Sequence, residues 1–161
     1  NFFSAADYQF QQVRLRLFVP EAANLAGFIA LGADFEDGLQ LLGAYITLNG
    51  QPLTAAANPQ AGDWLRVSLV WAVSAPPSGD YSVFVHAMTP AQGIVGQHDF
   101  PPSGRITTQL TTGEQLLDVH EFQLEAMPEG GLQVLVGLYD PGQMVRVHLV
   151  AGGDALRVWP P

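Results

Sequence analysis

The chain has 161 residues and a formal net charge of −9, with no lysine and no cysteine. Its acidic charge and its few, scattered arginines exclude a basic surface for nucleic acid, and an anionic bilayer would repel it. Without cysteine the chain forms neither disulfides nor thiolate metal sites, and its length suits one domain, residues 1–161.

Alternating apolar residues predict strands along most of the chain. Residues 13–19 alternate in this way, and their strand ends at Pro20. Residues 40–48 predict another strand, which ends at Asn49-Gly50, the strongest two-residue hairpin signal. Residues 21–26 offer the only helical turn, and it is too short to be stable alone.

The second half of the chain repeats one hairpin design. Residues 81–90 and 132–141 are apolar runs that break at a Pro-containing turn, and a second short run follows each, at 94–95 and 144–150. Before them lies a strand on which alternate residues share one apolar face: Leu65, Val67, Leu69, Trp71 and Val73.

These patterns predict an all-β fold, an antiparallel two-sheet β-sandwich of the jelly-roll or Ig-like kind, with about nine or ten strands. We expect residues 1–10 and 159–161 to be terminal or linker segments in a fragment of a longer protein. No run approaches the roughly 20 apolar residues of a membrane span. No signal-peptide pattern is present either, so we expect no direct membrane insertion by this fragment.

Two polar residues interrupt an apolar strand face. Asp118 and His120 lie two residues apart, so both side chains point to the same face. Buried polar groups need partners. The structural interpretation is a hydrogen-bonded polar cluster with His86 and Asp99, in which the indole of Trp71 is a further partner. The functional interpretation is a metal or sugar site at the same residues. We favour the structural one and expect neither a metal nor another cofactor.

Catalytic motifs are absent from the sequence. There is no Gly-x-Ser-x-Gly elbow, no His-Glu-x-x-His and no phosphate-binding glycine loop. The carboxylate pairs Glu36-Asp37 and Glu121/Glu125 are typical of solvated positions. Asp34, Glu36 and Asp37 also offer the oxygen ligands that calcium prefers, but a solvated acidic turn is the favoured interpretation. We therefore expect no catalytic residues and no enzymatic activity.

Four aromatic residues are candidates for stacking against the apolar face of a sugar ring. Trp64 follows a Gly-Asp turn at a strand start, and Trp159 precedes a Pro-Pro end. The alternative, which we favour, is that these rings close the ends of the core, as large aromatic residues commonly do. The four ligand-binding candidates are Trp64, Tyr81, Tyr139 and Trp159.

Several blocks between about residues 25 and 158 together resemble a known domain family. The family is the soluble C-terminal β-sandwich domain of bacterial polytopic membrane proteins of the glycosyltransferase or mannosyltransferase kind. This chain has Leu110 where the family often carries Trp. The blocks are Leu42–Tyr45, Ala61–Trp71, Asp80–His86, Gln97–Pro101, Gly113–His120 and Val136–Asp140.

The resemblance implies an extracytoplasmic domain, tethered through its parent protein beside a membrane-embedded enzyme that uses lipid-linked sugars. On this basis we expect a non-catalytic accessory domain that docks on its parent glycosyltransferase-like protein or contacts the substrate or acceptor. The alternative is a self-sufficient carbohydrate-binding β-sandwich module. The expected partners are the parent protein and a glycan, and no nucleic acid.

Overall fold

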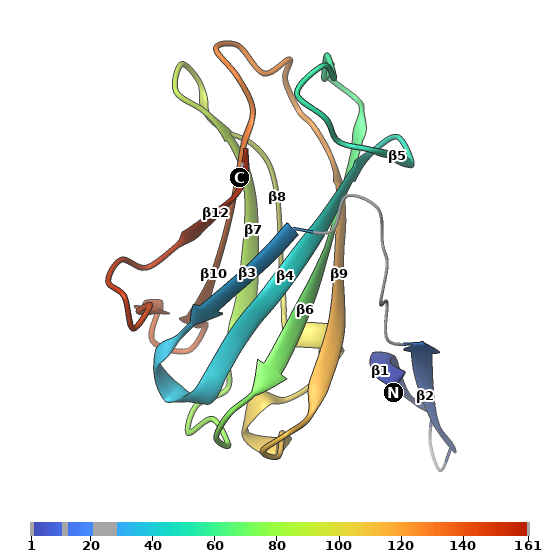
Figure 1. The fold of residues 1–161 in the computed structure, drawn as a ribbon, viewed down its shortest axis with the longest axis vertical. Helices are drawn as coiled ribbons and strands as arrows, with labels where there is room; N and C mark the ends of the chain where they lie inside the picture. The colour runs from blue at the N-terminus through green and yellow to red at the C-terminus, as the bar shows by residue number, and fades with distance from the viewer. Residues whose placement is uncertain (1, 11–12, 21–28, 161) are drawn as a thin grey trace.

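The structure is a computed structural model that describes the backbone of residues 2–10, 13–20 and 29–160 and the side chains of residues 29–160. In these residues the chain forms ten strands of four or more residues and two shorter ones, β5 and β11. Two antiparallel sheets pack face to face (Figure 1). This confirms the predicted all-β sandwich.

The first sheet has the strand order β2-β1-β9-β6-β4-β3, and β5 pairs with β4. All its pairings are antiparallel except the short parallel contact between β1 and β9. Its strands are β1 (Phe2–Phe10), β2 (Val13–Pro20), β3 (Ile29–Asp34), β4 (Leu39–Leu48), β5 (Gln51–Pro52), β6 (Trp64–Val73) and β9 (Gln115–Gln123).

The second sheet has the order β11-β10-β7-β8, and β12 also pairs with β10. Its strands are β7 (Ser82–Thr89), β8 (Gly93–Phe100), β10 (Gln133–Asp140), β11 (Val145–Val147) and β12 (Leu156–Trp159). Three short 3₁₀ helices lie in the connections that the structure describes: η1 (Glu36–Gly38), η2 (Pro102–Gly104) and η3 (Thr107–Gln109).

The chain passes between the sheets after β6, β8 and β9. β6 is antiparallel to β9 in the first sheet and β7 is antiparallel to β10 in the second, so the passages after β6 and after β9 lie at opposite ends of the sandwich. The two sheets are thereby linked at both ends.

The core lies between the two inner faces. Leu65, Val67, Leu69 and Trp71 of β6 are all fully buried, as the alternating pattern predicts. The second sheet contributes Val83, Val85 and Ala87 of β7 and alternate residues of β10 to the same cluster. Phe84 of β7 is also buried, although it points to the outer face.

The predicted hairpins are present. β7 and β8 form one, and β10 and β11 form the other. Between β4 and β5, Asn49 and Gly50 have φ angles of 50° and 79°, the left-handed geometry of a tight two-residue turn.

The ends differ from the expectation that residues 1–10 and 159–161 are terminal or linker segments. Residues 2–10 form β1, which pairs with β2 and β9, and Trp159 is the last residue of β12. The predicted strand over residues 13–20 is confirmed as β2. The helical turn suggested for residues 21–26 lies outside the described residues.

Candidate functional site

A groove crosses the outer face of the first sheet, over β4, β6 and β9. It is open to solvent and has a volume of about 660 Å³. On each strand its residues alternate with core residues, because successive side chains point to opposite faces. We call it the β4–β6–β9 groove, and it is lined by Tyr45, Thr47, Asn49, Gly50, Trp64, Arg66, Ser68 and Glu121.

Trp64 is the larger of the two aromatic side chains that line this groove, and 48% of it is exposed. Its backbone N–H donates to Asn49 Oδ1 at 2.9 Å. Asn49 Nδ2 in turn donates to Asp63 Oδ1 at 2.8 Å. These bonds fix the start of β6, so the indole is held at the groove with much of its surface in solvent.

Arg66 and Glu121 form an ion pair on the floor of the groove. Arg66 Nε lies 3.5 Å from Glu121 Oε2, and the two side chains are 56% and 48% exposed. An exposed pair at this separation is weak and easily exchanged for other partners. Guanidinium donors and carboxylate acceptors are therefore available beside the indole of Trp64.

Tyr81 is committed to internal contacts. Its ring lies over Gly79, where a Cβ atom would come within 2.8 Å of the ring, and its hydroxyl donates to Asp37 Oδ2 at 2.6 Å. Burial raises the pKa of Tyr81, and the bond to Asp37 raises it further. Burial alone would raise the pKa of Asp37, but bonds from Tyr81 and Ser78 outweigh it and lower that pKa.

Tyr139 and Trp159 occupy two other places. Tyr139 lies on the outer face of the second sheet, with its ring centroid 6.4 Å from that of Phe84. Trp159 is partly buried against the core. It lines a separate cavity of about 550 Å³, to which Leu53 and Leu132 also contribute. The four predicted aromatic residues thus do not form one site, and Trp64 is the most exposed of them, with nearly half its surface in solvent.

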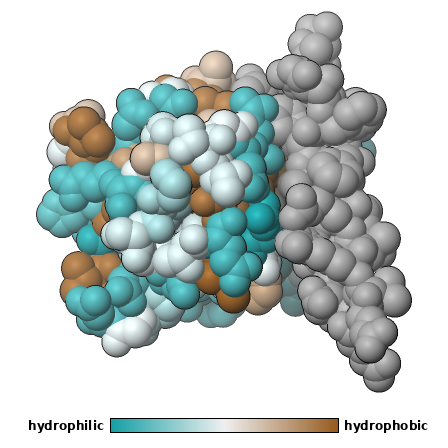
Figure 2. Space-filling model, turned by 90° about the horizontal axis from the view of Figure 1, so that it is seen from below, coloured by the Kyte–Doolittle hydropathy of each residue, from teal (hydrophilic) through white to brown (hydrophobic). Residues whose placement is uncertain are grey.

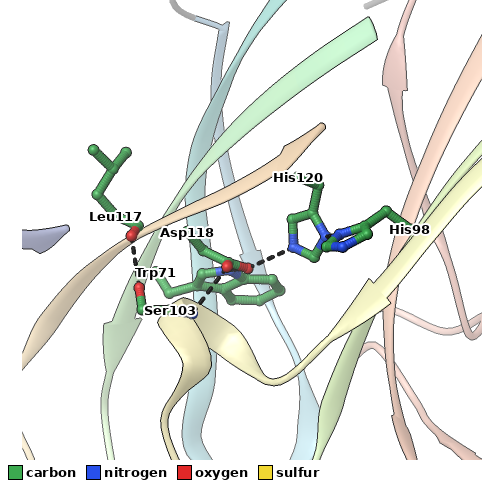
Figure 3. A network of polar contacts seen from close by, with 6 residues as sticks. All are labelled: Trp71, His98, Ser103, Leu117, Asp118 and His120. Atoms are coloured by element: carbon green, nitrogen blue, oxygen red, sulfur yellow. Dashed lines mark hydrogen bonds and ion pairs between the residues drawn. The ribbon is translucent and has the colours of Figure 1, made fainter. Parts of the chain in front are cut away.

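Asp118 and His120 belong to a buried network that links the two sheets (Figure 3). Asp118 accepts three hydrogen bonds: from Trp71 Nε1 at 3.3 Å, from the Ser103 backbone N–H at 2.9 Å and from His120 Nε2 at 2.8 Å. His120 Nδ1 lies 2.9 Å from Nδ1 of His98, on β8 of the other sheet. We call these five residues the inter-sheet network.

The hydrogen bonds determine the tautomers of the two histidines. Asp118 Oδ2 accepts, so His120 Nε2 carries the proton and His120 Nδ1 accepts in turn from His98 Nδ1–H. Burial lowers the pKa of His98, and the neighbouring His120 lowers it further. Ser103 Oγ donates to the carbonyl of Leu117 at 2.6 Å, so its hydroxyl is not a partner of either imidazole. The network satisfies its polar groups and holds the sheets together.

The predicted cluster of His86, Asp99, Asp118 and His120 is divided in two. Asp118 and His120 point into the core, whereas His86 and Asp99 lie on the outer face of the second sheet, with His86 Nε2 3.5 Å from Asp99 Oδ1. Burial lowers the pKa of His86, Asp99 opposes this shift, and Arg146 reinforces it. His86 resembled a core residue because β7 is buried on both faces.

The predicted acidic turn is not simply solvated. Asp34 accepts from Gln40 Nε2 at 2.8 Å, and Asp37 accepts from both N and Oγ of Ser78 in addition to Tyr81. Among residues 29–160, whose side chains the structure describes, no three acidic or histidine side chains converge as a metal site would require.

The described residues include no helix with the length and apolar character of a membrane span. Figure 2 shows the end of the sandwich where β6 ends and β4 and β9 begin. Its described surface is largely hydrophilic, and the hydrophobic residues there lie in separate small groups. The described part of this end therefore shows no continuous apolar patch.

Sequence reasoning did not single out Tyr45, Arg66 or His98. Tyr45 and Arg66 lie on the outward-facing side of alternating strands. The pairing register of β4 and β6 places them on the same face as Trp64. A polar residue on an outward face carries no signal by itself. His98 lies on β8, whose pairing with β7 shifts register between Ala87 and Met88, so simple alternation does not give its direction.

The comparisons add no assignment. The chain matches no protein-family model, no curated protein and no solved structure.

Proposed function

We propose that this chain is a non-catalytic accessory domain that contacts carbohydrate through the β4–β6–β9 groove. The observation that carries the proposal is the exposed indole of Trp64 beside the Arg66–Glu121 pair. An aromatic face binds the apolar face of a sugar ring, and adjacent charged groups bond its hydroxyls. This combination is what a shallow sugar site on a sheet needs.

Attachment to a membrane-bound glycosyltransferase-like parent, on the extracytoplasmic side, is the second part of the proposal. Its support is the resemblance of blocks such as Asp80–His86 and Val136–Asp140 to the domain family. A tethered domain works with weak intrinsic affinity, because its ligand is held at an effective concentration in the millimolar range for short flexible linkers. An open groove with one exposed indole fits such weak binding.

The groove is tested by calorimetry and NMR titration with mannose-, glucose- and galactose-containing oligosaccharides. We expect dissociation constants between about 0.1 and 1 mM, near −5 kcal/mol. Trp64→Ala should weaken binding at least about tenfold, which is 1.4 kcal/mol. Phe100→Ala is the matched control, because Phe100 is 51% exposed but lies on the other sheet, and it should bind as the unmodified domain does.

Three outcomes contradict the proposal. The first is the absence of binding to all three classes of oligosaccharide at millimolar concentration. The second is binding that survives Trp64→Ala but is lost in Phe100→Ala. The third is hydrolysis of any of these glycosides by the purified domain. The tethering part is tested separately by the complete reading frame, which should encode several apolar spans of about 20 residues.

A further inference from the structure

The groove holds a second aromatic side chain, Tyr45, at a defined distance from Trp64. Tyr45 is opposite Ser68 in the β4–β6 ladder, and Ser68 is four residues along β6 from Trp64. At about 3.3 Å per residue, the two aromatic residues are separated by about 13 Å along the strands and by one strand across them. This separation exceeds the length of a disaccharide.

A row of hydrogen-bonding side chains crosses the groove between the two rings. Thr47 is opposite Arg66, and Arg66 is opposite Glu121, so the row spans β4, β6 and β9. Asn49 is committed to the Trp64 backbone and to Asp63, so it contributes to the shape of the groove more than to recognition. Thr47 is buried, whereas Arg66 and Glu121 are exposed and place charged donors and acceptors in the middle of the groove.

The charge in the groove is balanced. The guanidinium of Arg66 has the carboxylate of Glu121 beside it, and the chain as a whole carries a net charge of −9. A polyanionic ligand would meet repulsion from the whole molecule without an uncompensated cation to bind it. The hydroxyl groups of an uncharged ligand can replace the weak Arg66–Glu121 contact at little electrostatic cost.

From these positions we infer that the groove binds a linear, uncharged oligosaccharide of at least three units, an inference that rests on the proposed function. Trp64 lies under the sugar at one end and Tyr45 under the sugar at the other. Arg66 and Glu121 bond the hydroxyls of the unit between them. A trisaccharide is the shortest ligand that touches both rings.

The test is a length series of linear gluco- and manno-oligosaccharides of one to five units, measured by calorimetry. We expect affinity to rise at least about fivefold from the disaccharide to the trisaccharide and little beyond it. Tyr45→Ala should remove this step, and Tyr45→Phe should keep it, because the ring and not the hydroxyl is needed. Tyr45→Leu provides a second variant if Tyr45→Ala does not fold.

The possible results separate this inference from the proposed function. Binding that depends on Trp64 but shows no step at three units, or a step that survives Tyr45→Ala and Tyr45→Leu, overturns the inference and leaves the proposed function standing. A linear oligouronate that binds more tightly than the neutral trisaccharide overturns the assignment to uncharged ligands. No binding at any length overturns the proposed function and the inference together.

Discussion

The inter-sheet network and the β4–β6–β9 groove use the same two strands in opposite ways. β6 carries Trp71 on its inner face and Trp64 on its outer face. β9 carries Asp118 inside and Glu121 outside. The inner indole donates to a buried carboxylate, whereas the outer one has nearly half its surface in solvent.

The difference lies in how completely the polar groups are satisfied. Asp118 accepts three hydrogen bonds and is 2% exposed, so it has little capacity left for a ligand. Arg66 and Glu121 share one long contact and are largely hydrated. Saturated polar groups stabilise the fold, and unsaturated ones at the surface are available for binding.

The largest expected effect is the loss of the buried carboxylate. Asp118→Ala leaves three donors without an acceptor inside the sandwich, and we expect a loss of about 3 kcal/mol or more in the free energy of unfolding. Urea denaturation measures it. Glu121→Ala, on the outer face of the same strand, should change the free energy of unfolding by less than about 0.5 kcal/mol. Equal losses in the two variants would erase the distinction between the faces.

An intermediate effect is expected from His98 and depends on pH. His98→Ala deprives His120 Nδ1 of its donor and should cost about 1–2 kcal/mol at pH 8. Because burial lowers the folded-state pKa of His98, its stabilising contribution is present above the unfolded value of 6.5 and is lost as the pH falls below it.

The difference between the unmodified domain and His98→Ala should therefore shrink between about pH 6.5 and the lower folded-state pKa of His98. Urea denaturation at a series of pH values measures this. Gln97→Ala, a neighbouring exposed change without a titrating group, should show a pH-independent difference. A His98→Ala difference that grows on acidification would show that protonated His98 stabilises the fold.

The smallest effect is expected at the ion pair of the groove. A double-mutant cycle of Arg66→Ala and Glu121→Ala should give a coupling energy below about 1 kcal/mol, which decreases further in 1 M salt because the pair is exposed. Both single variants should still weaken trisaccharide binding. A coupling energy above about 2 kcal/mol would place this pair with the saturated groups of the interior.

Alternation along single strands predicted much of this arrangement. The inward face of β6, the paired directions of Asp118 and His120 and the partnership with Trp71 all follow from a two-residue period on neighbouring strands. The period does not reveal which face of a strand is the inner one when both are apolar. β7 is such a strand, so His86 and its neighbour Asp99 were grouped with Asp118 and His120, although the first two lie on the outer face of the second sheet.

The groove could not be predicted in the same way. It depends on the register that places Tyr45, Arg66 and Glu121 on adjacent strands, and register is set by long-range pairing. Each of these residues alone is an ordinary polar or aromatic position on a solvent-facing side. Trp64 was recognised because a bulky indole after a Gly-Asp turn is unusual in itself.

The β6–β9 ladder has a consequence for how the chain folds. Its partners are far apart in sequence, with Trp71 and Asp118 separated by 47 positions. Closing such loops is slow, so folding on a timescale of about milliseconds to seconds is expected. Until β9 is synthesised and inserted, one edge of β6 has no partner, and the nascent sheet is exposed to pairing with other chains. Both the network and the groove are then completed by the arrival of one strand.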